Sequence, residues 1–326
     1  MGVYHLMGLG LSAGTVTGPL SYLAHRYARY DDGGRAFFDG SGERMHREEG
    51  RRVGDVQALV LFSTREVMDG TIDGRYCDNR YGSVGDGTQR SGTVADVLRR
   101  TLAEVLPPLA PGRGEMPVYW CEVDRGDFEG TFRRMARVVA TLRGAGKQGK
   151  EMWANLTGGT NVMNTALLLA ATLSGDVART YYVQAPTGSE ACLRCPREEG
   201  YWVELPLVPL AVSPLAEPVL DLLTRTGLLS AAQILGRLAG GHADLLARVD
   251  AAGFVRGHLA PLWKAQLVAE LSPPGTPDRD KTYGVGPRWE AVLGYVETLR
   301  EARASGQAMD DLAREGWLRA DSIPLR

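Results

Sequence analysis

The chain lacks the features that direct a protein to a membrane, to an oxidising compartment or to a polyanion. Lysine plus arginine number 37 against 39 aspartate plus glutamate, so neither sign of charge is in excess. The longest apolar run, Ala166–Ser174, has about half of the roughly 18–20 residues of a membrane-spanning helix. The N-terminus has no signal-peptide pattern. We therefore expect a cytoplasmic protein without a membrane partner, in which a local site holds any anionic ligand.

Cysteine is scarce, with four residues: Cys77, Cys121, Cys192 and Cys195. Cys192 and Cys195 have the CxxC spacing of half a zinc site or of a redox motif, but a structural zinc site needs four ligands. No second CxxC pair is present, and the five histidines are scattered. The CxxC segment also lies in a predicted turn rather than at the start of a helix. The sequence thus predicts reduced turn cysteines, no metal and no cofactor.

Apolar periodicity in the first two thirds of the chain alternates between strands and helices. Strands are predicted at Val3–Gly10, Val56–Ser63, Val118–Val123, Glu151–Leu156, Arg179–Gln184 and, near an edge, Tyr201–Leu210. Helices are predicted at Pro19–Tyr30, Thr93–Leu109, Phe128–Gly144 and Asn161–Leu173. Strands that are apolar throughout favour a parallel sheet covered on both faces. The predicted class is α/β, a Rossmann-like, doubly wound and mainly parallel sheet in residues 1–210, with Thr64–Gly92 as a long connection.

A change in composition around Pro209–Pro218 marks a predicted second domain, residues 211–326. Short helices are predicted at Glu217–Thr226, Ser230–Leu238 and His242–Ala252, followed by a proline-containing segment with Tyr283. This order resembles a small, mostly helical winged helix-turn-helix. Arg288–Ala304 is predicted as a closing helix before a short tail.

The first predicted strand runs into a loop rich in glycine and hydroxyl groups, Gly8-Leu9-Gly10-Leu11-Ser12-Ala13-Gly14-Thr15-Val16-Thr17. Glycine lets a backbone approach a phosphate closely, and the next helix points its positive end at the same place. A nicotinamide cofactor would need an acidic residue at the end of the second strand, within a unit of about 30 residues. That strand ends instead in Ser63-Thr64-Arg65, after a long insertion. An NADP-dependent enzyme is therefore a less favoured alternative.

The fourth strand leads into Asn155-Leu156-Thr157-Gly158-Gly159-Thr160-Asn161-Val162-Met163, at the start of an apolar helix. Two adjacent glycines between threonines at a strand-to-helix junction are typical of a concave patch of backbone N–H donors. Burial of these polar side chains without a ligand requires internal hydrogen-bond partners. Capping of the helix by Thr160 is one such use.

The two loops together resemble the CARF family, the CRISPR-associated Rossmann folds that sense cyclic oligoadenylates. The resemblance covers residues 1–210, and Asn155–Met163 carries most of it, as a match to T-G-G-T-K/N-x-M after a strand. It implies a homodimer with a two-fold-symmetric pocket for a cyclic oligoadenylate, with cyclic tetra-adenylate favoured, in type III CRISPR antiviral defence. The loops match at Ser12, Gly14, Thr15, Thr17, Thr157, Gly158, Gly159, Thr160, Asn161 and Met163. The candidate ligand-binding set adds Gly10, Thr64, Arg65 and Asn155.

The resemblance also implies a ring nuclease, with Ser12 and Asn161 as candidate catalytic residues. Such cleavage needs no metal, because a ribose 2′-hydroxyl attacks the neighbouring phosphate in line while the protein stabilises the charge. Many family members carry lysine where this chain has Asn161, which donates hydrogen bonds but supplies no full positive charge. Candidate substitutes for the lysine are Arg65, Arg75, Arg80 and Arg90. Binding with cleavage and binding without it both stay open.

The sequence of the second domain leaves open which activity this domain performs. A winged helix indicates a ligand-controlled DNA-binding regulator, with Arg248, Arg256, His258 and Lys264 as the candidate DNA contact. The near-neutral charge of this domain fits a dimerisation module equally well. Arg237 and His242 have the spacing of a HEPN-type ribonuclease motif, although Gly240-Gly241 would break the helix that bears it.

Overall fold

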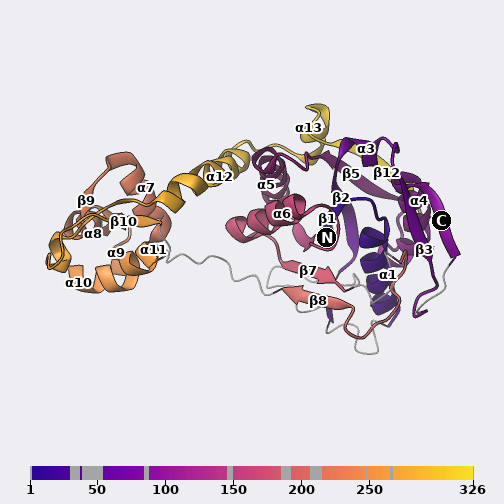
Figure 1. Ribbon diagram of the computed structural model, residues 1–326, viewed down its shortest axis with the longest axis horizontal. Coiled ribbons are helices and arrows are strands. Elements are labelled where there is room, and N and C mark those ends of the chain that lie inside the picture. Colours follow the sequence, from indigo (N-terminus) through magenta and orange to yellow (C-terminus); the bar gives the residue numbers. More distant parts are fainter. Residues whose placement is uncertain are drawn as a thin grey trace. The chain divides into compact units, whose positions relative to one another are not determined.

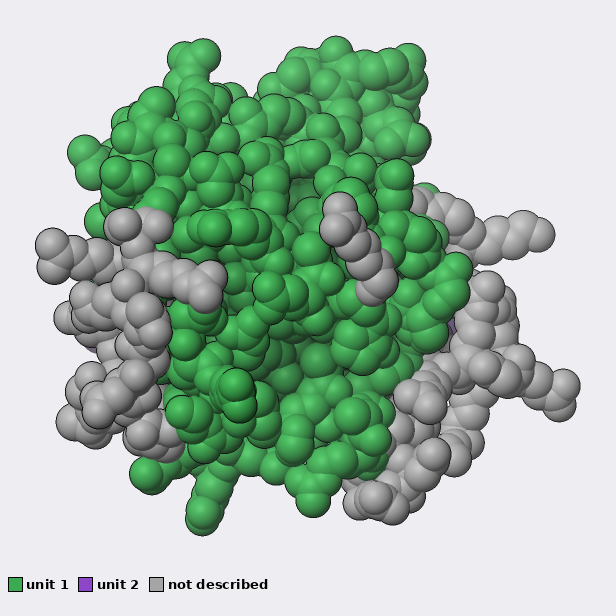
Figure 2. All heavy atoms as spheres, turned by 90° about the vertical axis from the view of Figure 1, so that its right-hand side faces the viewer, with its two compact units in different colours: residues 1–209, 298–326 green, residues 210–297 purple. Residues whose placement is uncertain are grey.

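The computed structural model describes residues 2–29, 37–38, 54–83, 88–144, 150–184, 192–205, 215–246, 249–264 and 267–325. The chain forms two compact units: unit 1 comprises residues 1–209 and 298–326 (green in Figure 2), and unit 2 comprises residues 210–297. No helix in these described ranges is long and apolar enough to cross a membrane.

Unit 1 is built on a seven-stranded sheet with the order β12-β5-β2-β1-β6-β7-β8. Its strands are β1 (Val3–Leu9), β2 (Val56–Ser63), β5 (Glu115–Glu122), β6 (Glu151–Asn155), β7 (Arg179–Val183), β8 (Trp202–Leu205) and β12 (Arg319–Pro324). The five central strands are parallel, and only the edge strands β8 and β12 run antiparallel to their neighbours. The predicted α/β class with a mainly parallel sheet is confirmed.

Helices cover both faces of this sheet (Figure 1). α1 (Gly14–Ala28) and α4 (Val94–Val105) lie on one face, and α5 (Phe128–Gly144) and α6 (Asn161–Ser174) lie on the other. β1 is buried along its whole length and β2 is buried at all but one position, which explains their continuous apolar sequences. The core between the layers contains Trp120, Trp153 and Tyr181.

Helix α1 begins five residues before the predicted start at Pro19. Backbone N–H groups of Val16 and Thr17 both donate to Ala13 O at 3.0 Å, so the helical turn is already formed at Gly14. Pro19 therefore lies inside the helix rather than in its first turn. The prediction failed because Gly14 and the β-branched Thr15, Val16 and Thr17 are weak helix formers, and tertiary contacts outweigh that preference.

Two parts of unit 1 were not predicted from the sequence. The long connection after β2 contains α3 (Arg65–Met68) and an antiparallel hairpin, β3 (Asp73–Asp78) and β4 (Thr88–Thr93). The predicted C-terminal tail contains α13 (Met309–Arg314) and β12, which pairs with β5 from Arg319↔Trp120 to Pro324↔Glu115. Residues 298–326 therefore belong to unit 1, whereas the sequence placed them in the second domain.

Unit 2 packs short helices on a three-stranded antiparallel sheet with the order β10-β11-β9. Its elements are α7 (Ala216–Thr226), β9 (Leu229–Ser230), α8 (Ala231–Ala239), α9 (Ala243–Leu246), α10 (Ala251–Phe254), α11 (Ala260–Lys264), β10 (Val268–Glu270) and β11 (Thr282–Val285), followed by α12 (Pro287–Ala304), which runs on into unit 1. Val219, Ile234, Phe254 and Tyr283 form part of its core.

The predicted helix His242–Ala252 is wrong. α9 ends at Leu246, and a new helix begins at Ala251, where the Asp250 carboxylate accepts a hydrogen bond from Gly253 N at 2.7 Å. α10, the π-turn Val255–Leu259 and α11 then follow one another without a break. The N-cap aspartate at position 250 is the signal that separates the two helices.

Candidate functional site

The candidate site lies where the winding of the sheet reverses. β1 and β6 are parallel neighbours, and the chain continues outward from β1 to β2 and β5 on one side and from β6 to β7 on the other. Loop 1 (residues 10–13) follows β1, and loop 2 (residues 156–160) follows β6, so both lie at the carboxyl edge of the sheet. Crevices at this position bind ligands in open α/β sheets.

The two loops touch each other through their glycines. A Cβ atom added to Gly8 would lie within 3.0 Å of Gly158 O, and one added to Gly158 would lie equally close to Gly8 O and Thr15 Oγ1. Gly159 has a φ of +86°, which favours glycine, and its backbone is 3.6 Å from an added Cβ of Gly10. Only glycine at positions 8 and 158 lets the backbones meet, so the loops form one continuous surface.

Asn155 fastens loop 2 to helix α1. Pro19 has no N–H, so Thr15 O four residues before it lacks the usual helical donor. The Asn155 Nδ2 group donates to that carbonyl at 2.9 Å, while Asn155 Oδ1 accepts from Thr157 N at 2.9 Å. The fully buried Asn155 amide therefore has a partner on each side.

Several other predicted site residues also have internal partners. The Thr157 hydroxyl accepts from Val183 N at 2.9 Å, and the Thr160 hydroxyl accepts from Met163 N at 3.3 Å as the N-cap of α6. Thr15 and Thr17 donate their hydroxyl protons to Ser12 O and Ala13 O, respectively. These bonds hold both loops in shape without a ligand.

Ser12 and Asn161 differ from these residues in their hydrogen bonding. Ser12 Oγ is an inaccessible atom with no hydrogen-bond partner among the described residues, although the residue as a whole is partly exposed. Asn161 is exposed at the first position of α6, where the first backbone N–H groups of a helix lack intrahelical acceptors. Together they leave hydrogen-bonding capacity at the junction of the two loops.

The end of β2 contributes a cation at the same edge of the sheet. Thr64 precedes α3, and exposed Arg65 pairs with Asp69, with 3.6 Å between Nε and Oδ2. Arg80 is exposed beyond β3. Arg75 and Arg90 lie on the paired strands β3 and β4, and their side chains are outside the described part. Arg65 and Arg80 are therefore the described members of the predicted set of substitutes for lysine.

Sequence reasoning missed two residues at the loops. Tyr76 on β3 is buried, and a Cβ added to Gly74 would lie within 3.0 Å of both its hydroxyl and Leu11 O in loop 1. Burial, with the nearby Asp73 charge, raises the pKa of Tyr76 to about 12, so the hydroxyl stays protonated. Asn164 Oδ1 lies 3.4 Å from an added Cβ of Gly8. Neither atom has a hydrogen-bond partner among the described residues. Asn164 directly follows the recognised motif, whereas nothing in the sequence of the hairpin pointed to Tyr76.

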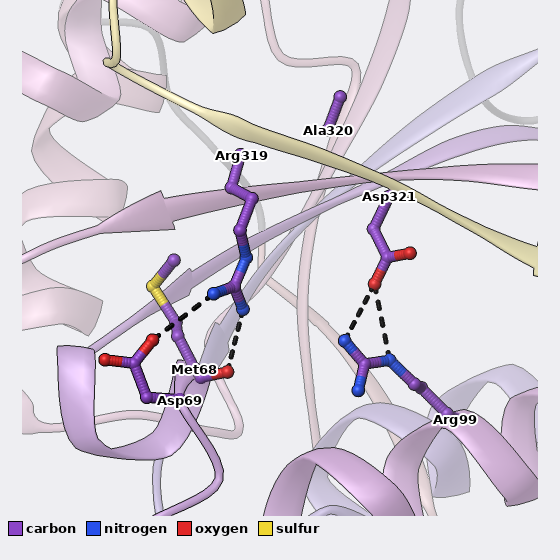
Figure 3. A pocket seen from close by; sticks show the side chains of 6 residues that line it. All are labelled: Met68, Asp69, Arg99, Arg319, Ala320 and Asp321. Atoms are coloured by element: carbon purple, nitrogen blue, oxygen red, sulfur yellow. Dashed lines mark hydrogen bonds and ion pairs between the residues drawn. The ribbon is translucent and has the colours of Figure 1, made fainter.

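A depression away from the two loops, with a volume of about 460 Å³, is lined by Met68, Asp69, Arg99, Arg319, Ala320 and Asp321 (Figure 3). Its arginines already have partners: Arg99 pairs with Asp321 at 2.9 Å and Arg319 with Asp69 at 3.3 Å. Burial opposes ionisation of Asp321, yet hydrogen bonds from Arg99 and Ser322 N keep its pKa below the usual value. These ion pairs fasten β12 to α3 and α4 rather than leave cations for a phosphate.

A metal centre finds no support in the described ranges, because no three His, Cys, Asp or Glu side chains there could share an ion. The HEPN-like spacing is also interrupted: α8 ends at Ala239, so the helix that carries Arg237 does not carry His242. Both residues line a surface depression together with Asp221 and Arg225.

Comparisons with known proteins do not assign the chain to a family. No family model matches the chain. An uncharacterised protein of Archaeoglobus fulgidus is 26% identical over 188 residues, which is 56% of this chain and 57% of that protein. The chain thus matches little more than half the length of this relative.

Two solved structures show partial likeness. Csm6 of Enterococcus italicus, bound to cyclic hexa-2'-fluoro-hexa-dAMP, has a TM-score of 0.40 at 13% identity, covering 81% of this chain and 56% of that one. Can2 of Sulfobacillus thermosulfidooxidans, in complex with cyclic tetra-adenylate, has a TM-score of 0.30 at 10% identity, covering 93% of this chain and 64% of that one. Likeness at this level does not transfer a ligand to this chain.

Proposed function

We propose that this chain is a CARF-type protein that binds a cyclic oligoadenylate, with cyclic tetra-adenylate favoured, as part of type III CRISPR defence. The observation that carries the proposal is the glycine contact between loop 1 and loop 2 at the point where the sheet winding reverses. The sequence of these two loops is the part that resembles the family, and the fold brings them together.

The chemistry of the joined loops suits a phosphodiester ring. The helices α1 and α6 both begin there, and the N-terminus of a helix attracts anions through its backbone N–H groups and dipole. Asn161 is exposed and can donate hydrogen bonds, Ser12 Oγ has no partner among the described residues, and Arg65 is a described cation at the end of β2. Asn155, Thr157 and Thr160 act as positioning residues, because their polar atoms already have internal partners.

A homodimer would give the site the two-fold symmetry of the ring. Helix α6 contains no charged residue, and Asn161, Thr165 and Leu168 are exposed at the spacing of one helical face. An uncharged face that starts at loop 2 fits contact with a second copy of itself, because an isologous interface places the same loop on each side of the axis. The ring would then be held by both copies.

The proposal also includes cleavage of the bound ring. The ribose 2′-hydroxyl attacks the adjacent phosphorus, the bond to the 5′-oxygen breaks, and a 2′,3′-cyclic phosphate and a 5′-hydroxyl result. Ser12 and Asn161 would donate hydrogen bonds to the phosphate oxygens as negative charge builds on them. Since neither carries a positive charge, we expect slow cleavage.

The test is titration of the purified protein with cyclic tri-, tetra- and hexa-adenylate in EDTA, followed by chromatography of the nucleotides. Cyclic tetra-adenylate should bind most tightly, and Asn161→Ala should weaken binding about tenfold or more. Conversion to linear products that Ser12→Ala abolishes would establish the ring nuclease, and intact recovery would make the protein a sensor. If none of the rings binds, the proposal is wrong.

The dimer has its own test. Leu168→Arg places a charge on the α6 face, where the leucine is 37% exposed, and should convert a dimer to a monomer in analytical ultracentrifugation. Leu228→Arg, at a leucine that is 59% exposed in unit 2, is the matched control and should leave the mass unchanged. A monomeric unsubstituted protein, with or without the ring, would exclude the symmetric site.

A second candidate function, DNA binding by unit 2, is favoured by the position of its helices. The order α7, β9, α8, α9, α10–α11, β10, β11 resembles that of a winged helix, in which the helix before the hairpin contacts DNA. This helix, residues 251–264, contains Arg256, His258 and Lys264 and no acidic residue. The helix predicted from sequence carried Asp244 and Asp250 instead. Arg248, another predicted contact, lies outside the described residues.

Electrophoretic mobility shift with genomic DNA fragments tests this second function, with and without cyclic tetra-adenylate. Arg256→Ala should abolish a shift that Arg279→Ala, in the exposed segment between β10 and β11, only weakens. Binding that shows no dependence on Arg256 would place the DNA contact elsewhere.

A further inference from the structure

Three of the four cysteines come together in unit 1, although more than a hundred residues separate Cys77 from the other two. Cys192 and Cys195 lie in the segment before β8, and Cys77 lies in β3. Cys77 and Cys192 form an isolated parallel β-bridge, and Leu193 N donates to Cys77 O at 3.0 Å. All four cysteines are thiols rather than disulfides.

The β-bridge gives Cys77 and Cys192 a spacing that suits a disulfide. Residues paired across neighbouring strands are about 4.8 Å apart, and a disulfide joins Cα atoms roughly 4.4–6.8 Å apart. Partners in a bridge of this kind also project their side chains from the same face. The backbone pairing therefore places the two residues within the Cα range of a disulfide.

Exposure distinguishes the three thiols. Cys77 is partly exposed, whereas Cys192 and Cys195 are buried. Burial raises the pKa of the Cys195 thiol to about 12, and its Sγ donates a hydrogen bond to Arg197 O at 2.7 Å. Cys195 is therefore held as an unreactive thiol, and an oxidant in solvent reaches Cys77 first.

We propose that Cys77 and Cys192 are a reversible redox pair, oxidised by a peroxide to a disulfide that joins β3 to the segment 192–201. This modification site stands whether or not the loops bind a cyclic oligoadenylate. It differs from the CxxC pair that the sequence suggests, because the fold offers Cys192 a partner on β3 that is nearer to solvent than Cys195.

The chemistry balances with one peroxide for each disulfide. The Cys77 sulfur attacks one peroxide oxygen, the O–O bond breaks, and the departing hydroxide takes the thiol proton to give water and a sulfenic acid. The Cys192 sulfur then attacks the Cys77 sulfur, an S–S bond forms, and the S–O bond breaks. The hydroxide takes the Cys192 proton and leaves as a second water. A thiol reductant reverses the reaction by thiol–disulfide exchange.

The disulfide would couple the hairpin to helix α1. Segment 192–201 already binds α1: Cys195 N donates to Ser21 Oγ at 2.7 Å, and Glu198 pairs with Arg26 at 2.8 Å and with Arg29 at 3.1 Å. Its Arg194 pairs with Asp78 at the end of β3 at 2.6 Å. A covalent bond added here constrains α1, which follows loop 1, and β3, whose Gly74 adjoins Leu11.

The experiment treats the reduced full-length protein with an equimolar amount of hydrogen peroxide and maps the peptides without reduction. We expect a cross-linked pair of peptides containing Cys77 and Cys192, with the loss of two hydrogen atoms. The midpoint of thermal unfolding should rise by about 5–10 °C and return after dithiothreitol.

Matched variants make the result specific. Cys77→Ser and Cys192→Ser should each abolish the cross-link and the thermal shift, whereas Cys195→Ser and Cys121→Ser should keep both. If a variant does not fold, the peptide map of the unsubstituted protein decides. A Cys192–Cys195 disulfide, a Cys77 sulfinic acid without a cross-link, or unreacted thiols would each overturn the proposal.

Discussion

Loop 1 and loop 2 follow neighbouring strands and touch each other, yet they differ in whether their polar side chains have hydrogen-bond partners. In loop 2 the polar side chains of Thr157 and Thr160 bond to the backbone, and Asn155 fastens the loop to α1. In loop 1 the Ser12 hydroxyl has no partner among the described residues, and Leu11 is 63% exposed. The polar side chains of loop 2 already have internal hydrogen-bond partners, whereas the Ser12 hydroxyl of loop 1 has none among the described residues. Buried polar atoms without a partner are rare in folded proteins, so loop 1 is where a bound ligand or water would add a hydrogen bond.

The largest expected effect comes from separating the loops. Gly158→Ala places a Cβ within 3.0 Å of Gly8 O and Thr15 Oγ1, so we expect a loss of about 3 kcal/mol in the free energy of unfolding by urea. Gly10→Ala is the control, since its Cβ would meet ordinary contacts beginning at 3.6 Å, and its loss should stay below about 0.5 kcal/mol. Equal losses at both positions would show that the glycine contact does not determine the structure of the site.

The next effect tests the fastening of loop 2. Asn155→Ala leaves Thr15 O and Thr157 N without their buried partner, at a cost of about 2–3 kcal/mol in the same urea titration. The double variant Asn155→Ala, Pro19→Ala restores an N–H that can donate to Thr15 O, so part of the loss should be recovered. Simple addition of the two single effects would contradict the link between Pro19 and Asn155.

The strands beneath both loops should respond to pH. His5 on β1 is fully buried against Trp153 on β6, and burial lowers its pKa from 6.5 to about 3. As the pH falls, the unfolded chain binds a proton at His5 before the folded protein does. His5 therefore does not lower the free energy of unfolding above pH 6.5, and lowers it progressively as the pH drops toward 3. Between pH 7 and 5 we expect this group to cost about 2 kcal/mol. His5→Phe should lack that part of the decline, and the same slope in both proteins would rule out His5 as its source.

The smallest effect on stability belongs to Ser12. Ser12→Ala removes a hydroxyl without a partner among the described residues, so the free energy of unfolding should change by less than about 0.5 kcal/mol. A larger loss would mean that loop 1 is as internally bonded as loop 2.

The sequence identifies those parts of the fold that local periodicity determines. The strands β1, β2 and β6 and the helices α5 and α6 lie where apolar patterns place them, because each packs one continuous face on its neighbours. The start of α1 was missed because its stabilising contacts are tertiary: Asn155 bonds to Thr15 O from another strand. β3, β4 and β12 were missed because they are polar edge segments whose only strand signal is their pairing partner.

In the candidate site, too, the sequence pointed to some residues and missed others. Its motif residues were singled out because glycine, threonine and asparagine gather at a strand-to-helix junction. Tyr76 was not found, since a tyrosine in a polar connection carries no local sign that a hairpin brings it to Leu11. The Cys77–Cys192 pairing was equally hidden, because the CxxC spacing directs attention to the neighbour in sequence rather than to the neighbour in space.

The pairing of β12 with β5 has a consequence for synthesis on the ribosome. Residues 319–324 emerge only after the whole of unit 2 has been translated, so β5 waits with an unpaired edge while residues 210–297 are made. Val118 and Trp120 on that edge strand are apolar, and exposed strand edges recruit other chains. The interval between translation of β5 and arrival of β12 is therefore the period in which the nascent protein is most prone to aggregate, and slow translation through unit 2 would lengthen it.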